Sequence, residues 1–197
     1  MDLISRRFQI LVKVCAINAK VVKVTFGKQV DKASAINEAN YQFIVNGSPA
    51  AVEGDTVGKK GTVTKDGKSV LFILSTPLKN ADKYSVNVND AVLDKDLNKF
   101  EKYAGTVKTF SDTAAPQLLS AKVTAGSDAT KKKIELAFNE PVSSTMTVKV
   151  DGVQVATSVT PKIDGEDYLA SFEVPVAGHE LLSPEIGFES YPLILLS

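Results

Sequence analysis

The chain has 197 residues, enough for one large domain or for two domains of about 100 residues, each able to bury its own core. Its 23 basic and 23 acidic side chains give a formal net charge of zero, so we expect no general electrostatic attraction to nucleic acid or anionic lipid. The single cysteine, Cys15, excludes an internal disulfide and a zinc site made of four cysteines.

The first segment, 1–11, does not share the pattern of the residues that follow it. Arg6 and Arg7 precede a largely apolar run, 8–12, which Lys13 ends. This run is too short for the apolar region of a secretory signal and far too short to span a bilayer. We therefore expect no membrane insertion, and we expect no signal peptide within this chain.

Alternation of apolar and polar residues predicts strands along most of the chain, because a strand with one buried face repeats every two residues. The run 70–74 is continuously apolar, as in a strand buried on both faces. Helical periodicity is limited to one short turn within 31–40, for which we expect Ser34 as the cap. The predicted class is all-β, with strands that include 22–26, 70–74, 84–88, 106–110, 134–138 and 146–150.

Pairs of residues that tolerate positive φ angles separate these runs and predict tight hairpin turns. The pairs are Asn46-Gly47, Asp66-Gly67, Asp151-Gly152 and Asp164-Gly165.

A long internal repeat indicates two domains of the same kind. The stretch VKVTFGKQVD (22–31) is answered by IELAFNEPVS (134–143), an offset of 112 residues. Gly47 and Gly152 match at an offset of 105, and DGKSVLFILSTPL (66–78) matches DGEDYLASFEVPV (164–176) at 98. The two deletions fall in predicted loops, which tolerate changes of length. A period near 100 residues suits tandem sandwich domains.

The repeat predicts the boundaries of the domains. We expect a first β-sandwich over 12–110, a linker over 111–116 that ends in Pro116, and a partial second sandwich over 117–177. The tail, 178–197, has no alternation at 181–188, and its apolar end at 193–196 looks foreign to the repeat. We expect an incomplete second sandwich with strand edges open to another chain.

The sequence resembles a known family at these same positions. AINAKVVKVTFGKQVDKAS, AVLDKDLNKF and DTAAPQLLSAKV resemble the immunoglobulin-like modules of S-layer and other surface proteins of Gram-positive bacteria. The resemblance implies a two-sheet sandwich that serves as a spacer or lattice module, without catalysis. It also implies a secreted protein at the cell wall, self-association with neighbouring subunits, and calcium as the one cofactor to consider.

Strand periodicity also predicts which side chains fill the two cores. For the first core they are Val22, Val24, Phe26, Leu71, Ile73, Val86 and Val88, and for the second Ile134, Leu136, Phe138, Val148, Val150 and Phe172.

The candidate metal ligands are Asp94, Asp96 and Asn98, three oxygen-bearing side chains at alternate positions, as at the start of a calcium loop. Lys99 stands where such a loop needs glycine, and Gly105 stands where it needs a closing glutamate. A helix–loop–helix site is therefore not expected. A looser calcium site at the sandwich edge and a plain polar turn stay open.

No catalytic residue is predicted. His179 is the single histidine and lies in the tail, so we expect no nucleophilic pair with Cys15, which we interpret as a half-buried strand residue. Neighbouring acids such as Glu166 and Asp167 fall in turns, and without tryptophan they do not indicate a glycosidase.

Two further motifs have plain structural explanations. Asn46-Gly47-Ser48 is formally a glycosylation sequon, but Asn-Gly in a hairpin already explains it. The basic run 131–133 is expected to be a solvated strand end that discourages edge pairing, with contact to an anionic cell-wall polymer as the alternative.

The sequence thus predicts a non-enzymatic structural module of a bacterial surface protein. The alternative is a binding module, either an adhesin or a carbohydrate-binding part of a cell-wall protein.

Overall fold

The computed structural model describes residues 11–53, 61–142, 144–150, 153–164, 166–175 and 193–196. Antiparallel strands make up nearly all of the regular structure, together with a four-residue helix α1 (Lys32–Ala35) and a single 3-10 turn η1 (Glu38–Asn40). The all-β class is confirmed. In the described part of the chain, no helix is long and apolar enough to cross a membrane.

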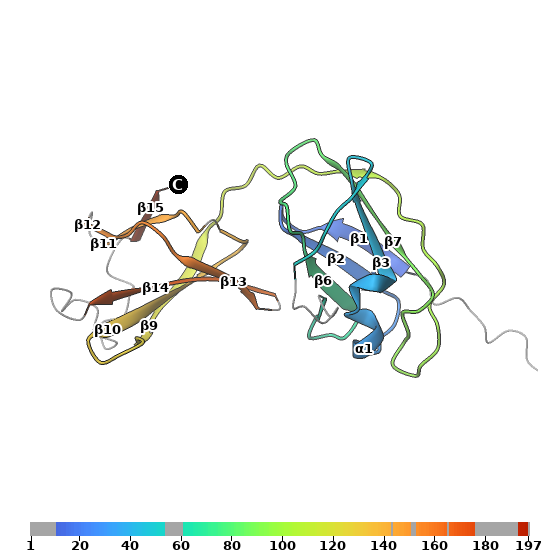
Figure 1. The fold of residues 1–197 in the computed structure, drawn as a ribbon, viewed down its shortest axis with the longest axis horizontal. Helices are drawn as coiled ribbons and strands as arrows, with labels where there is room; N and C mark the ends of the chain where they lie inside the picture. Colours follow the sequence, from blue (N-terminus) through green and yellow to red (C-terminus); the bar gives the residue numbers. More distant parts are fainter. Residues whose placement is uncertain are drawn as a thin grey trace, which may run out of the picture. The chain divides into compact units, whose positions relative to one another are not determined.

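The chain divides into two compact units, Met1–Thr113 and Ala114–Ser197. The division falls inside the segment 111–116, the predicted linker. Figure 1 shows the strands of each unit gathered into their own body. We describe each unit by itself.

Unit 1 contains two four-stranded antiparallel sheets, ordered β1-β2-β6-β5 and β4-β3-β7-β8. This is the strand order of an immunoglobulin sandwich, A-B-E-D in one sheet and C′-C-F-G in the other. The strands are β1 (Leu11–Ala16), β2 (Val21–Phe26), β3 (Tyr41–Val45), β4 (Ser48–Pro49), β5 (Thr62–Val63), β6 (Ser69–Ile73), β7 (Lys83–Val88) and β8 (Lys108–Thr109).

One hydrophobic core joins the two sheets of unit 1. Val22, Val24 and Phe26 enter it from β2, and Val86 and Val88 enter it from β7, as predicted. Aromatic rings fill its centre: the Phe26 and Phe100 centroids lie 4.8 Å apart, and those of Tyr41 and Phe72 lie 4.5 Å apart.

The predicted core face of β6 was wrong. Val70 and Phe72 of β6, with Leu74 just beyond it, belong to the core cluster, whereas Leu71 and Ile73 lie on the other face of the sheet. Leu71 is still buried, at 3% exposure, so the predicted burial of this run on both faces is confirmed at that position. Opposite residues of an antiparallel pair share a face, and β6 pairs Phe72 with the core residue Val22. A continuously apolar run has no alternation from which its phase could be predicted.

The predicted helical turn exists, but its cap is Asp31. The Asp31 side chain accepts a hydrogen bond from the Ser34 backbone N–H at 2.8 Å, so Ser34 lies inside the turn. The Ser34 hydroxyl instead accepts from Leu93 N–H at 3.0 Å and thereby ties a distant loop to this helix.

Unit 2 repeats this topology. Its sheets run β9-β10-β14-β13 and β12-β11-β15, so β9 stands where β1 stands, β10 where β2 stands, and β15 where β7 stands. Among the described residues, no strand takes the place of β8. The strands are β9 (Leu118–Ala125), β10 (Lys131–Phe138), β11 (Thr147–Val150), β12 (Val153–Ala156), β13 (Thr160–Asp164), β14 (Asp167–Pro175) and β15 (Leu193–Leu196).

The repeat extends to an irregularity in the first strand of each unit. The pairing of β1 with β2 skips one residue between Leu11 and Lys13, and the pairing of β9 with β10 skips one between Leu118 and Ser120. At the offset of 112 residues, Phe26 corresponds to Phe138, and the two bulges then fall at the same position. A bulge bends and twists its strand, so the duplicated geometry includes this local twist.

The apolar end of the tail was predicted to be foreign to the repeat, and this prediction was wrong. Leu193–Leu196 forms β15 and pairs with β11, with Leu193 opposite Val150. In unit 1, Tyr84 of β7 lies opposite Val45 of β3 in the same way. The rest of the predicted tail, including 181–188, lies outside the described residues.

The core prediction for unit 2 holds where it can be compared. Ile134, Leu136, Phe138, Val148 and Phe172 are all buried. The side chain of Val150 lies outside the described part of the structure.

Candidate functional site

The predicted calcium ligands lie in a tight turn whose centre is a buried carboxylate. Asp94 is 1% exposed, and its Oδ1 accepts from the backbone N–H groups of Asp96 and Asn98 at 2.9 Å each. The Asn98 side-chain amide also donates to this oxygen at 3.2 Å. The Lys28 ammonium lies 3.7 Å from Oδ2. The carboxylate thus organises the turn through hydrogen bonds and a nearby positive charge.

The other two predicted ligands do not share the burial of Asp94. The side chains of Asp96 and Asn98 are exposed on the turn, and within the described residues no group of three or more acidic, histidine or cysteine side chains is placed to hold a metal ion. Calcium bound to Asp94 Oδ1 would have to displace N–H donors, because a cation and a donor compete for the same lone pairs, and calcium bound to Oδ2 would compete with the Lys28 ammonium. Binding of calcium stays a prediction.

The same turn holds an exposed apolar residue in an unusual conformation. Leu97 has φ of +62° and is 67% exposed. Residues other than glycine are disfavoured in this left-handed region because their Cβ atom crowds the backbone. Two hydrogen bonds, from Leu97 N–H to the Asp94 carbonyl and from Asp94 N–H to the Asn98 carbonyl, hold the turn closed.

The Asn46-Gly47-Ser48 motif is a hairpin turn, as expected. Asn46 and Gly47 have φ of +50° and +81° between β3 and β4. The Asn46 side chain donates to the Asp82 carboxylate at 2.8 Å and accepts from Lys83 N–H at 2.9 Å. The Asn46 amide therefore already holds this turn to the start of β7.

The Asp66-Gly67 turn is also confirmed, with φ of +70° at Gly67 between β5 and β6. The other two predicted turns, Asp151-Gly152 and Asp164-Gly165, include residues outside the described part of the structure.

Cys15 lies on the edge strand β1 and is partly buried, as predicted. His179 lies outside the described residues, so the expectation that it forms no pair with Cys15 stays a prediction. Glu166 and Asp167 are exposed at the β13–β14 hairpin. Glu166 lies in the turn, as predicted, whereas Asp167 is the first residue of β14 and lies opposite Asp164.

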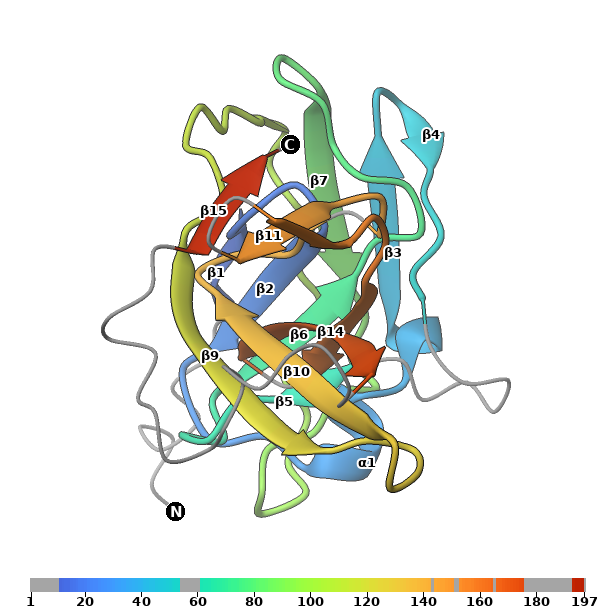
Figure 2. The same ribbon diagram turned by 90° about the vertical axis from the view of Figure 1, so that its left-hand side faces the viewer.

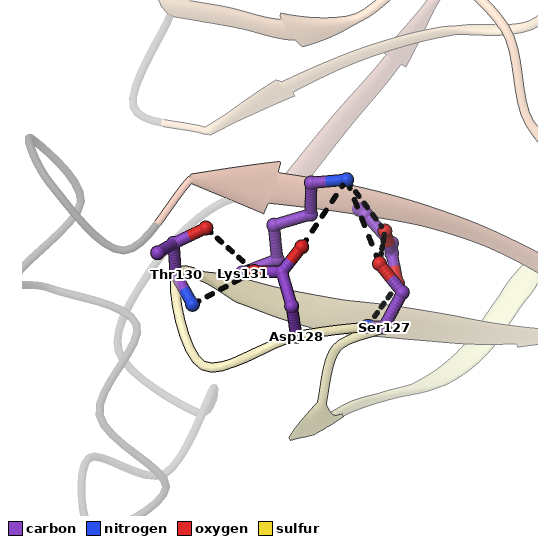
Figure 3. Close-up of polar contacts among 5 residues, drawn as sticks. Ser127, Asp128, Thr130 and Lys131 are labelled. Atoms are coloured by element: carbon purple, nitrogen blue, oxygen red, sulfur yellow. Dashed lines mark hydrogen bonds and ion pairs between the residues drawn. The ribbon is translucent and has the colours of Figure 1, made fainter.

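A polar cluster closes the β9–β10 hairpin onto β14 (Figure 3). Glu173 accepts from the Ser127 backbone N–H at 2.5 Å and from its hydroxyl at 2.8 Å, and the Lys131 ammonium lies 3.5 Å from the same carboxylate. Asp128 accepts from the Thr130 N–H and hydroxyl. These hydrogen bonds lower the pKa of the Glu173 and Asp128 carboxyls below their usual range.

The role predicted for the basic run 131–133 needs correction. These lysines begin β10, which lies between β14 and β9 and is therefore not an edge strand. They cannot discourage pairing at an edge that does not exist. Lys131 instead contacts Asp128 and Glu173, and Lys133 lies 3.8 Å from Glu135.

Sequence reasoning missed a seam between the two sheets of unit 1. The Ala16 backbone N–H on the outer edge of β1 donates to the Tyr84 hydroxyl at 3.0 Å. The Lys108 ammonium donates to the neighbouring carbonyl of Val14. These contacts join strands far apart in the sequence, so strand periodicity gives no sign of them.

Comparison with known proteins finds a similarity to a bacterial cell wall protein. No protein-family model matches the chain. The chain is 31% identical over 143 residues to an outer cell wall protein of Brevibacillus brevis (strain 47), a match that spans 73% of this chain and 12% of that protein. The expected resemblance to modules of bacterial surface proteins is confirmed.

Solved structures with a similar course of the chain include domains 1–6 of the surface layer protein SbsC, with a TM-score of 0.48, 13% identity, and coverage of 98% of this chain and 41% of that one. Another is an alpha-2-macroglobulin from Escherichia coli, with a TM-score of 0.44, 12% identity, and coverage of 97% and 60%. At these scores the likenesses assign no function.

Proposed function

We propose that this chain is a non-enzymatic structural part of a bacterial surface-layer or cell-surface protein. Its two immunoglobulin-like units act as spacers, and their outer faces contact neighbouring subunits of the same protein. The observation that carries the proposal is the similarity to an outer cell wall protein over most of this chain.

The physical properties of the chain support this role. Two successive sandwiches, each with its own sheets, resist local unfolding because strands on both sides of a core must separate together. The formal charge of zero limits general repulsion between copies packed side by side. The one cysteine leaves stability to the cores, as no disulfide can form within the chain.

Location is the first test. Antibodies raised against the purified chain should label the outside of intact cells that produce this protein. As a control, an antibody against a protein of the cell interior should give no signal until the cells are permeabilised. Labelling of the chain only after permeabilisation would overturn the proposal.

Assembly is the second test, and it includes the calcium prediction. Electron microscopy of the purified chain with calcium and with a chelator should show ordered assemblies in at least one of these conditions. If calcium acts through Asp94, Asp96 and Asn98, the D96A/N98A double variant should abolish the difference between the two conditions. Soluble, dispersed particles in both conditions would count against a lattice role.

The basic run at the start of β10 supplies a further part of the proposal, contact with an anionic cell-wall polymer. Lys132 projects from the same strand as Lys131 and Lys133, which have acidic neighbours. Binding to purified cell-wall polymer should weaken as salt is added, because screening reduces such contacts. Binding that does not respond to salt would remove this part of the proposal.

A further inference from the structure

The outer edge of β9 is unpaired among the residues that the structure describes. β9 pairs with β10 through seven residue pairs, and the sheet order places no described strand on its other side. Figure 2 shows β9 in yellow as the outermost strand beside β10. Such an edge presents backbone N–H and C=O groups that can extend a sheet with another chain.

The ladder shows which groups point outward. Gly126 donates its N–H to the carbonyl of Lys131 in β10. Backbone groups alternate in direction along a strand, so the N–H and C=O groups of Ser120, Lys122 and Thr124 also point toward β10. The residues between them, Ala121, Val123 and Ala125, direct their N–H and C=O groups away from the sheet.

At the equivalent edge in unit 1, two outward backbone groups already have partners within the unit. Ala121 and Val123 lie opposite Leu136 and Ile134. Val14 and Ala16 likewise lie opposite Val24 and Val22, which stand 112 residues before Leu136 and Ile134. In unit 1 the Val14 carbonyl accepts from the Lys108 ammonium of β8, and the Ala16 N–H donates to the Tyr84 hydroxyl of β7.

Neither of these partner groups has a described counterpart in unit 2. Tyr84 lies opposite Val45, the last residue of β3, and Leu193 lies opposite Val150, the last residue of β11. Leu193 therefore occupies the position of Tyr84, and leucine has no hydroxyl. No described strand occupies the place of β8, which supplies Lys108 in unit 1.

The two edges also differ in where their lysine lies. β9 has the exposed Lys122 where β1 has Cys15, since these lie opposite Glu135 and Lys23. Lys13 is exposed at the position in β1 that Ser120 occupies in β9, since they lie opposite Thr25 and Ala137. An edge lysine discourages pairing with another strand, and at this position β9 has a small neutral residue instead. Leu119, the extra residue in the bulge of β9, is 65% exposed and adds apolar surface beside this edge.

We propose that the β9 edge is the site where a second copy of this chain adds its own β9 in antiparallel orientation. This inference rests on the self-association in the proposed function and assigns it a surface. In such a pair, the residue at the two-fold axis lies opposite its own copy. With Ala121, Lys122 or Val123 at the axis, the outward N–H and C=O groups of one copy lie opposite those of the other. The register centred on Lys122 puts two ammonium groups side by side, whereas the other two put Lys122 beside Ser120 or Thr124. Identical edges related by a two-fold axis make a closed pair, which favours a second copy over an unrelated strand.

The test is the association of the full chain, measured by sedimentation equilibrium, with three variants. Ala121→Pro removes an outward N–H that β10 does not use, so the fold should persist. Ser120→Lys restores the lysine of β1 and leaves every backbone group in place. Ala121→Val keeps the N–H and serves as the matched control.

The parent chain, without substitutions, should form dimers. The dissociation constant of the dimer should rise at least about tenfold in Ala121→Pro and in Ser120→Lys, since each change acts in both copies. Ala121→Val should stay within about twofold of the parent. Amide hydrogen exchange at Ala121, Val123 and Ala125 should slow as concentration rises.

Other results overturn the inference in distinguishable ways. Undiminished association of Ser120→Lys and Ala121→Pro means that copies meet through another surface, and the proposed function then stands without this edge. A monomeric parent chain whose edge amides are protected at every concentration means that the chain covers its own edge. A monomeric parent chain with unprotected edge amides excludes this pairing, and labelling of intact cells then decides separately whether the surface role holds.

Discussion

The two units share a strand order and even the position of a bulge, but they bury different kinds of side chain. Unit 1 buries polar side chains in addition to its apolar core, namely Asn18, Asn40, Thr64, Ser69, Ser85 and Asp94. Among the described residues of unit 2, the buried side chains are all hydrophobic or tyrosine. Ser69 and Ser85 lie in β6 and β7, and the other four lie in the connections between strands. Strand faces alone thus suffice for the sandwich frame, and these four polar groups serve the connections.

These polar groups hold loops that strand periodicity leaves undetermined. The Asn18 side chain accepts from Lys20 and Val21 N–H groups in the β1–β2 turn. The Asn40 amide donates to the Ser34 carbonyl at 2.8 Å. A buried amide or carboxylate needs partners, so each such residue specifies one conformation of its loop.

The largest expected effect compares the two cores at equivalent positions. Phe26 is 2% exposed and Phe138 is 3% exposed, so replacing either with alanine should cost about 3–5 kcal/mol of stability in its own unit. Urea unfolding followed by hydrogen exchange of each unit would measure both. A loss well below 1 kcal/mol at one position would show that the repeat does not extend to packing there.

A smaller effect should distinguish the buried polar groups from the frame. Asp94→Ala removes the acceptor of the Asp96 and Asn98 N–H groups and should cost unit 1 about 1–3 kcal/mol. The matched control, Asp96→Ala, changes an exposed side chain of the same turn and should stay within about 0.5 kcal/mol. Equal losses in the two variants would contradict the role assigned to the buried carboxylate.

The smallest effect concerns exposed carboxylates that hold turns in each unit. The Asn46 amide and then the Lys79 N–H lower the pKa of Asp82 in unit 1, and the Ser127 hydroxyl and N–H lower that of Glu173 in unit 2. A lowered folded-state pKa adds stability above the unfolded-state value, about 4, and this stability is lost as pH falls through the folded-state pKa.

Urea unfolding between pH 7 and pH 2 should therefore show each unit losing stability in acid. Asp82→Asn should flatten that dependence in unit 1 alone, and Glu173→Gln should flatten it in unit 2 alone. If the acid response of a unit does not change in its own variant, other carboxylates control it.

Much of the fold was predictable because alternation and repetition are local properties of a sequence. The alternate spacing of Val22, Val24 and Phe26 predicted a buried strand face. The recurrence of the same pattern around Phe138 predicted a second sandwich. β6 was different: all five residues of 70–74 are apolar, so its core face depended on which partner strand it joined. β15 was hidden because its counterpart in unit 1 contains polar residues at alternate positions, whereas Leu193–Leu196 is apolar throughout.

The sequence by itself determined the all-β class, the duplication and most of the core residues. It also determined the Asn46-Gly47 and Asp66-Gly67 turns. Each of these features depends on spacing or on local backbone preference. Only the tertiary structure decided the core face of β6, the hydrogen bonds around Asp94, the hydrogen bonds of Tyr84 and Lys108 to the β1 edge, and the open edge of β9. Each of these depends on contacts between residues far apart in the chain, and such contacts exist only once the strands have paired.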